Sequence, residues 1–187
     1  MKIFGICGQS GTGKSTIIKQ LCSTYHLYEI KETTDRPVRS SDDLQNYNFV
    51  SPDVFDEKII NDEFVTFSSF EVNHPQHYFR YGVDKKSIPQ NEVCIIQCNW
   101  DSLEKLHKYF GDDFISIQII RDDKQKLLSI LERNDNVYEV CDRFIRDVNR
   151  YEQLETDYVC FNNDSIAKCC SFIYDIILDE FRGVDVL

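Results

Sequence analysis

A glycine-rich segment near the start of the chain has the residue types and the spacing that bind phosphate. It reads Gly8-Gln9-Ser10-Gly11-Thr12-Gly13-Lys14-Ser15, followed by Thr16, which fits the pattern Gly-x-x-x-x-Gly-Lys-Ser. Glycines let the backbone wrap around a phosphate with its N–H groups turned inward, and a following helix adds its positive N-terminal end. In this pattern the lysine reaches the β- and γ-phosphates, and the serine hydroxyl is a ligand of Mg²⁺. The segment therefore predicts a site for a nucleoside triphosphate with Mg²⁺.

The rest of the sequence narrows the class of phosphate-binding protein. A GTPase would carry an Asn-Lys-x-Asp motif that reads its base, and this sequence has none. Motor proteins and large ATPases are usually longer than 187 residues. The remaining class is the small P-loop kinases, in which a site for an acceptor phosphate and an arginine-bearing lid accompany the loop.

The elements that must position this loop follow from apolar patterning. Residues 2–7 form an apolar run that predicts a buried parallel strand, and residues 15–25 carry apolar side chains at helical spacing. Further strands are predicted at 92–98, 114–120 and 158–161, and helices at 102–109, 123–133, 140–154 and 166–181. Strands that alternate with helices predict an α/β fold with a parallel sheet covered on both faces.

The stretch between the first helix and the second long strand has a different character. Residues 32–47 are polar and carry arginines, and Pro37 limits regular structure there, so this segment is predicted to be a loop over a site. Ser51 is a plausible N-cap of a helix with Phe55, Ile59 and Ile60 on one face. Residues 63–81 alternate aromatic and other side chains, which predicts short strands.

Composition sets limits on location and partners. A length of 187 residues fits one domain, and a formal net charge of −11 repels nucleic acid polymers and anionic membranes. No apolar run approaches the length of a membrane span, and no secretory signal is recognised, so a cytoplasmic protein is expected. The eight cysteines are expected to be free thiols, and those in apolar runs to be buried. The sequence leaves open whether the protein is a monomer or a homodimer.

Two motifs after the phosphate loop carry a resemblance to a known family. Thr33-Thr34-Asp35-Arg36-Pro37-Val38-Arg39 is followed by Tyr47-Asn48-Phe49-Val50-Ser51, and this order resembles the guanylate kinase family. The resemblance continues through Asn61-Asp62-Glu63-Phe64, Tyr81-Gly82, Leu131-Glu132-Arg133 and Arg143, and ends at Val159-Cys160-Phe161-Asn162-Asn163-Asp164. It covers nearly the whole chain, and its later motifs are weaker than the phosphate loop.

The resemblance implies an architecture and a division of roles. It implies one P-loop kinase domain with its core at 1–32 and 87–187, a small mixed α/β acceptor-binding insert at 33–86, and a helical lid at about 133–146. By resemblance, Arg36, Arg39, Tyr47 and Tyr81 grip the monophosphate of the acceptor, which suits guanidinium and phenol donors. Arg133 and Arg143 match lid arginines that, with Lys14, neutralise the transferring phosphoryl group. Asn162 matches a residue near the adenine of ATP.

The chain departs from the family pattern at several positions. Asp35 is an extra residue between the threonines and Arg36. The carboxylate that reads guanine in the family is replaced by Thr66, and Glu32, near the position that contacts O6 of guanine, or Glu71 could substitute for it. The acidic pair near Mg²⁺ and the acceptor phosphate is replaced by Gln97 and Asn99, with Asp101 two residues further on.

These departures leave the acceptor open. The leading expectation is transfer of the ATP γ-phosphate to GMP or dGMP. The alternatives are another or modified (deoxy)nucleoside monophosphate, or ribose 1,5-bisphosphate, because kinases for that sugar resemble the chain at Tyr81-Gly82-Val83 and likewise lack the base-reading carboxylate. A rival class is a non-catalytic guanylate-kinase-like module that binds a protein. Such modules usually have an eroded phosphate loop, whereas Lys14 and Ser15 are intact here.

Overall fold

A parallel sheet forms the centre of the protein. The computed structural model describes residues 1–38, 43–73, 76–90, 92–132 and 137–182. Within these residues, β1 (Lys2–Cys7), β2 (Tyr28–Ile30), β7 (Val93–Gln97), β8 (Phe114–Ile120) and β9 (Tyr158–Phe161) form a sheet in the order β2-β7-β1-β8-β9. All of its neighbouring strands run parallel. The phosphate loop therefore leaves the carboxyl end of the central strand, where ligands of such sheets bind.

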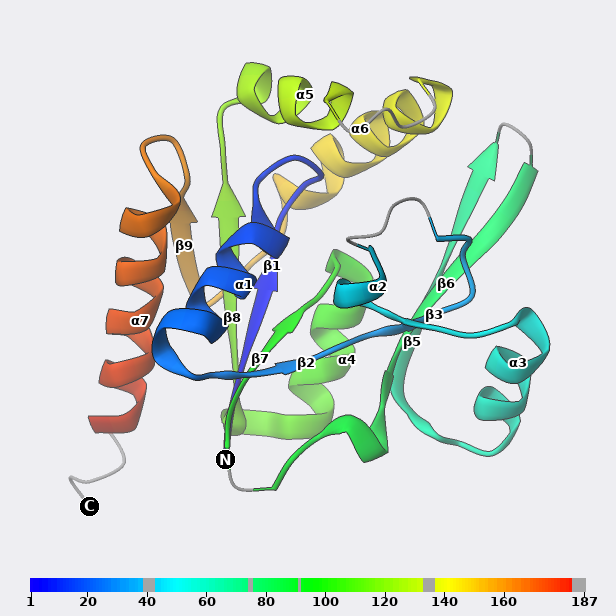
Figure 1. Cartoon of the computed structure of the whole chain (residues 1–187), viewed down its shortest axis with the longest axis horizontal. Coiled ribbons are helices and arrows are strands. Elements are labelled where there is room, and N and C mark those ends of the chain that lie inside the picture. The colour runs from blue at the N-terminus through cyan, green and yellow to red at the C-terminus, as the bar shows by residue number, and fades with distance from the viewer. Residues whose placement is uncertain (39–42, 74–75, 91, 133–136, 183–187) are drawn as a thin grey trace.

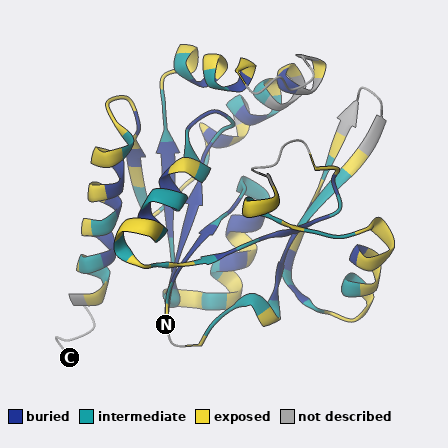
Figure 2. Cartoon of the chain, in the orientation of Figure 1, coloured by how far each residue is buried: buried dark blue, intermediate teal, exposed yellow. Residues whose placement is uncertain are grey.

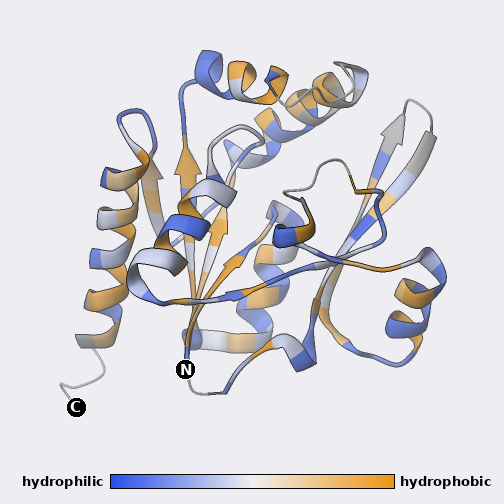
Figure 3. Cartoon of the chain, viewed as in Figure 1, coloured by the Kyte–Doolittle hydropathy of each residue, from blue (hydrophilic) through white to orange (hydrophobic). Residues whose placement is uncertain are grey.

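Helices cover both faces of this sheet (Figure 1). On one face, α1 (Lys14–Tyr25) and α7 (Ile166–Arg182) pack over an apolar cluster that includes Phe4, Ile117 and Ile173. On the other, α4 (Trp100–Phe110) and the end of α6 (Val137–Tyr151) cover a second cluster that includes Leu103 and Tyr151. Figure 2 shows the central strands β1, β7 and β8 as mostly buried, and Figure 3 shows the corresponding hydrophobic residues along them.

A second sheet carries the motifs that were predicted to bind the acceptor. Its order is β4-β3-β6-β5, built from β3 (Thr33–Thr34), β4 (Asn48–Phe49), β5 (Phe64–Asn73) and β6 (Gln76–Asp84). The short α2 (Asp43–Asn46) and α3 (Pro52–Ile60) connect these strands, and η1 (Lys85–Ser87) leads back to the core. The strands β5 and β6 form a long antiparallel hairpin that lies to one side of the core sheet (Figure 1).

The last elements lie near the phosphate loop. After β8, α5 (Asp123–Leu131) and α6 pass over the carboxyl end of the core sheet, where the loop also lies (Figure 1). A 3₁₀ turn, η2 (Gly111–Asp113), joins α4 to β8. None of the helices in the described parts of the chain is long and apolar enough to cross a membrane.

The predicted α/β fold is confirmed, with local corrections. The prediction that 32–47 is a loop is wrong in part, because β3 and α2 lie within it. The strand β3 pairs with β6, which is distant in sequence. Ser51 caps α3 as predicted, but Ile60 is 81% exposed. A helix turns 100° per residue, which places Ile60 about 140° from the buried Phe55. The helix predicted at 140–154 spans Val137–Tyr151, and β2 was not predicted.

The cysteine prediction is also confirmed. The thiols of Cys7, Cys94, Cys98, Cys160, Cys169 and Cys170 are free and buried. They act as small apolar side chains within the two clusters.

Candidate active site

The phosphate loop has the backbone conformation that its glycines predict. Gly11 and Gly13 have φ angles of 81° and 94°, in the left-handed region that disfavours other residues. A Cβ at Gly11 would lie 2.4 Å from the carbonyl oxygen of Lys126, and one at Gly13 would lie 2.7 Å from Nδ2 of Asn162. Gly13 caps α1 without a side-chain hydrogen bond. The amino end of α1 therefore retains the backbone donors that bind an anion.

Polar side chains hold the carbonyl oxygens of this loop. The Lys14 ammonium donates to the carbonyl oxygens of Gly8 and Gln9 at 2.6 and 2.9 Å. The Asn162 amide donates to the carbonyl oxygen of Thr12 at 2.8 Å. Because Lys14 and Asn162 bond these carbonyl oxygens, the N–H groups of the loop can point toward a phosphate. Asn162, which was predicted to lie near the adenine of ATP, thus contacts the phosphate loop.

The guanidinium of Arg121, which immediately follows β8, holds another carbonyl of the loop. Its Nη1 donates to the carbonyl oxygen of Gly11 at 3.1 Å and to the Ser129 hydroxyl at 2.9 Å. Sequence reasoning did not single out Arg121, because an arginine after a strand has no local signature. Its contact with the loop spans 110 residues of sequence.

A carboxylate from α6 lies against the same loop. Oδ2 of Asp147 accepts a hydrogen bond from the Ser10 backbone N–H at 3.2 Å, and Asp147 is 8% exposed. The Asp147 carboxylate therefore occupies the Ser10 N–H, one of the loop N–H groups that attract anions. Asp147 is a second residue that sequence reasoning missed.

We expect the Asp147→Asn variant to bind ATP more tightly than the wild-type protein. Its KM for ATP should be about three- to tenfold lower. The substitution removes a negative charge from beside the triphosphate, while the Asn oxygen can still accept from Ser10. Steady-state kinetics with varied ATP measure the effect. The control is Asp164→Asn, which removes an equal charge from an exposed ion pair with Lys168. An unchanged or raised KM in Asp147→Asn would contradict the expectation.

A chain of hydrogen bonds joins the phosphate loop to the second sheet. The Ser15 hydroxyl donates to Oε1 of Gln97 at 2.9 Å, and Nε2 of Gln97 donates to the Tyr47 hydroxyl at 2.9 Å. Burial raises the pKa of Tyr47 above its ordinary value, so its hydroxyl stays protonated and can donate to a further group. Ser15 of the predicted donor site and Tyr47 of the predicted acceptor site are thus linked through one side chain.

Arg36, which was predicted to bind the acceptor phosphate, lies beside Tyr47. Arg36 is 5% exposed, and its guanidinium carbon lies 5.0 Å from the centre of the Tyr47 ring and 5.3 Å from that of Phe49. The rings of Tyr47 and Tyr81 are 5.7 Å apart. The structure therefore brings Arg36, Tyr47 and Tyr81 together.

The extra residue Asp35 has a structural role next to Arg36. Its Oδ1 accepts from the Arg80 backbone N–H at 2.8 Å, and its Oδ2 accepts from Nε of Arg80 at 2.6 Å. Arg80 also bonds Asp56 and the carbonyl oxygen of Pro52. Asp35 thereby ties the chain just before Arg36 to β6 and α3.

Glu32 is a buried carboxyl group between the donor and acceptor residues. It is 7% exposed, and the charges that act on it include Lys14. Burial raises the pKa of Glu32 from 4.5 to about 8, against the opposing effect of Lys14. The carboxyl group is therefore mainly neutral at pH 7.

We expect the stability of the nucleotide-free protein to fall as pH rises from about 5 to 8, by an amount on the order of a few kcal/mol. The folded state keeps the Glu32 proton up to about pH 8, whereas the unfolded chain loses it near 4.5. Stability from this proton is thus complete below 4.5 and lost as pH passes 8. Urea unfolding between pH 5 and 9 measures it. The Glu32→Gln variant should show a shallower decline; equal slopes would contradict this account.

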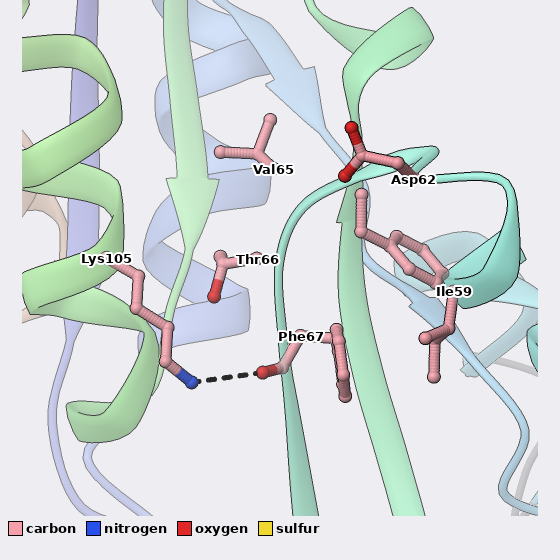
Figure 4. Close-up of a pocket in the computed structure, with 7 residues that line it drawn as sticks. Ile59, Asp62, Val65, Thr66, Phe67 and Lys105 are labelled. Atoms are coloured by element: carbon pink, nitrogen blue, oxygen red, sulfur yellow. Dashed lines mark hydrogen bonds between the residues drawn. The ribbon is translucent and has the colours of Figure 1, made fainter.

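Thr66 lies apart from the phosphate-binding residues. It borders a pocket of about 340 Å³ together with Ile59, Asp62, Phe64, Val65, Phe67 and Lys105. Figure 4 shows the Thr66 hydroxyl on the side of Lys105 and the Phe67 ring on the side of Ile59. Neither Arg36, Tyr47 nor Tyr81 lines this pocket. Oγ1 of Thr66 is buried and has no hydrogen-bond partner among the described residues.

Asn99 caps α4 in the structure. Its Oδ1 accepts from the backbone N–H groups of Asp101 and Ser102 at 2.9 and 3.0 Å, and the Ser102 hydroxyl accepts from the Asn99 N–H. This reciprocal capping box uses the side-chain oxygen of the residue that was predicted to bind the acceptor. Of the lid and acceptor arginines, Arg39 and Arg133 lie outside the described residues. Arg143 belongs to α6, but its side chain is not described.

The residues around Ser15 fit a magnesium ion. Mg²⁺ takes oxygen ligands and usually combines one or two protein groups with phosphate oxygens and waters. The Ser15 hydroxyl can offer a lone pair to the ion while its proton stays bonded to Gln97, as the 2.9 Å contact shows. Ser15 would therefore hold the ion, and Gln97 would orient that hydroxyl.

The chain is similar to known proteins of one family over most of its length. A guanylate kinase from Helicobacter hepaticus is 28% identical over 85% of this chain and 81% of its own length. One from Malacoplasma penetrans is 27% identical over 96% of this chain and 95% of its own. The crystal structure of guanylate kinase from Anaplasma phagocytophilum has the same fold, with a TM-score of 0.72, 19% identity, and coverage of 96% of this chain and 85% of that one. A model of the family described as guanylate kinase matches residues 1–180. The chain belongs to the guanylate kinase family.

Proposed function

We propose that this protein transfers the γ-phosphate of ATP to a nucleoside monophosphate, GMP or dGMP. The observation that carries the proposal is the hydrogen-bonded chain from Ser15 through Gln97 to Tyr47. It joins a triphosphate loop to a buried arginine, Arg36, next to that tyrosine. A donor phosphate and an acceptor phosphate can therefore lie on either side of Gln97.

Each group has a role in this proposal. ATP lies on residues 8–16 with its adenine near Asn162, and the acceptor phosphate lies against Arg36, Arg39, Tyr47 and Tyr81. Lys14, Arg133 and Arg143 neutralise the transferring phosphoryl group. Residues 33–86 are the acceptor-binding insert, and residues from about 133 to 146 are the lid.

The reaction needs alignment and charge neutralisation more than a general base. The acceptor phosphate has a second pKa of about 6, so at pH 7 its oxygen is already ionised and nucleophilic. Because Glu32 is mainly neutral at this pH, it adds little negative charge beside the phosphates. Mg²⁺, when bound, would neutralise charge on the triphosphate oxygens. This arrangement supports in-line transfer between two bound phosphates.

An acceptor panel tests the proposal. The protein is incubated with ATP, Mg²⁺ and one of GMP, dGMP, AMP, CMP, UMP or ribose 1,5-bisphosphate, and the products are separated by ion-exchange chromatography. The proposal predicts GDP and dGDP as the fastest products. Binding of ATP without a phosphorylated product from any acceptor would instead indicate a non-catalytic module.

A further inference from the structure

A series of aromatic rings extends from Arg36, the arginine that we propose binds the acceptor phosphate. The Arg36 guanidinium lies over Tyr47 at 5.0 Å, and the Tyr47 ring is 5.7 Å from that of Tyr81. The Tyr81 ring is 5.9 Å from Phe70, and Phe70 is 6.3 Å from Trp100. Each of these pairs is tilted or edge-on. The guanidinium carbons of Arg146 and Arg150 lie 5.1 and 4.6 Å from the ring centres of Phe70 and Trp100. These rings can therefore offer only their other faces and their edges to a flat heterocycle, such as the base of a nucleotide whose phosphate binds Arg36.

A carboxylate lies at the far end of this series. Ser68 pairs with Tyr81 across β5 and β6, so the two side chains share one face of the sheet. The Ser68 hydroxyl, on a residue that is 2% exposed, donates to Oδ2 of Asp101 at 2.8 Å. Asp101 directly follows Trp100 at the start of α4. The aromatic series thus runs from a cation to an anion.

The Asp101 carboxylate is equipped to accept hydrogen bonds. Burial acts to raise the pKa of Asp101, but hydrogen bonds from Lys105 and Ser68 outweigh it and hold that pKa below the ordinary value. The Lys105 ammonium and the Ser68 hydroxyl both donate to Oδ2, at 2.8 Å each. In the described part of the chain, Oδ1 receives no hydrogen bond that competes with a ligand. The side chain of Asp101 is 35% exposed, so a ligand can reach it.

Thr66 supplies an independent indication of a ligand. It is 5% exposed, and its hydroxyl has no partner among the residues that the structure describes. Thr66 and Ser68 are two positions apart on β5, so their side chains project from the same face. A buried hydroxyl without a partner costs free energy unless a ligand or water satisfies it.

We propose that Asp101, assisted by the Ser68 hydroxyl, selects the base of the acceptor, and that it selects guanine. Guanine has a ring N–H and an adjacent amino group that can both donate to one carboxylate. Adenine places a lone pair where guanine has the ring N–H, and a carboxylate repels that lone pair. The side-chain oxygen of Asn99 cannot take this role, because it already accepts the hydrogen bonds that cap α4. This inference rests on the proposed kinase function and names the side chains that set its acceptor.

Substitution of Asp101 by asparagine tests the inference in the full-length protein. The kcat/KM is measured for GMP, for IMP, which lacks the amino group, and for AMP. The wild-type protein should favour GMP over IMP by about tenfold or more, with AMP the poorest acceptor. Asp101→Asn should lower kcat/KM for GMP by about a hundredfold and bring the GMP-to-IMP ratio near one, with KM for ATP unchanged.

Matched variants separate base selection from a structural role. Lys105→Met breaks the same ion pair but keeps the carboxylate, so its GMP-to-IMP ratio should fall far less than that of Asp101→Asn. Ser68→Ala should lower the ratio by less than Asp101→Asn, and it serves alone if Asp101→Asn does not fold.

Several outcomes would overturn the inference. A folded Asp101→Asn protein that keeps the wild-type GMP-to-IMP ratio would do so. A Lys105→Met protein whose ratio falls as far as that of Asp101→Asn would also do so. If Ser68→Ala is the variant measured, an unchanged ratio would overturn the inference. If the wild-type protein phosphorylates no monophosphate, the kinase proposal fails as well. Phosphorylation of GMP with no preference over IMP defeats only the inference.

Discussion

Phosphoryl transfer by the Lys14→Ala variant is expected to be slower than that of the wild-type protein by about a thousandfold. The Lys14 ammonium holds the carbonyl oxygens of Gly8 and Gln9 in the nucleotide-free structure, at 2.6 and 2.9 Å. That position is at the phosphate loop, from which the side chain can extend to the β- and γ-phosphates. Its charge counts most in the transition state, so the loss should fall mainly on kcat. A coupled assay of ADP formation with saturating acceptor measures it.

The matched control for this substitution is on the same helix. Lys19→Ala removes an equal charge from α1 at a position more than one helical turn beyond Lys14, and it should keep at least half of the wild-type kcat. Thermal unfolding of each variant shows whether the fold is intact. A folded Lys14→Ala protein with a kcat near that of Lys19→Ala would contradict the assignment of the loop as the donor site.

Replacement of Arg36 by methionine should impair use of the monophosphate far more than use of ATP. We expect kcat/KM for the monophosphate to fall by about a hundredfold or more, whereas KM for ATP stays within about twofold. Arg36 is the buried cation beside Tyr47 and Tyr81, and a dianionic phosphate there loses charge-assisted hydrogen bonds when the guanidinium is removed. Steady-state kinetics with each substrate varied in turn separate the two effects.

Lys86→Met is the control for charge in the same part of the chain. Lys86 is exposed and lies 3.9 Å from Glu63, so its loss changes the net charge without touching the acceptor residues. Its acceptor kinetics should match those of the wild-type protein. If Arg36→Met and Lys86→Met behaved alike, or if Arg36→Met changed only KM for ATP, the acceptor site would lie elsewhere.

The sequence predicted the strand and the helix around the phosphate loop because the signals there are local. The phosphate loop is a fixed spacing of glycines, lysine and serine between a strand and a helix, and β1 and α1 lie where apolar patterning placed them. The capping of α3 by Ser51 also follows from local pattern. The same kind of signal, Asn99 followed by Ser102, could have identified the capping box of α4.

The remaining contacts could not be predicted because they join residues that are distant in sequence. Asp147 reaches Ser10 across 137 positions, and Gln97 reaches Ser15 across 82. No periodicity or spacing specifies which polar side chain of one element faces another once the chain folds. The pairing of β3 with β6, which corrected the predicted loop, depends on a partner of the same distant kind.

Transfer of the γ-phosphate can be followed through its phosphorus atom. The wild-type protein is incubated with Mg²⁺, ATP labelled with ³²P at the γ-position, and unlabelled GMP, and the nucleotides are separated by thin-layer chromatography. The label should move into GDP, with one ADP formed for each GDP, and omission of GMP should suppress ADP formation. Label that appears only as inorganic phosphate, or that stays in ATP whichever monophosphate is present, would contradict the proposed transfer.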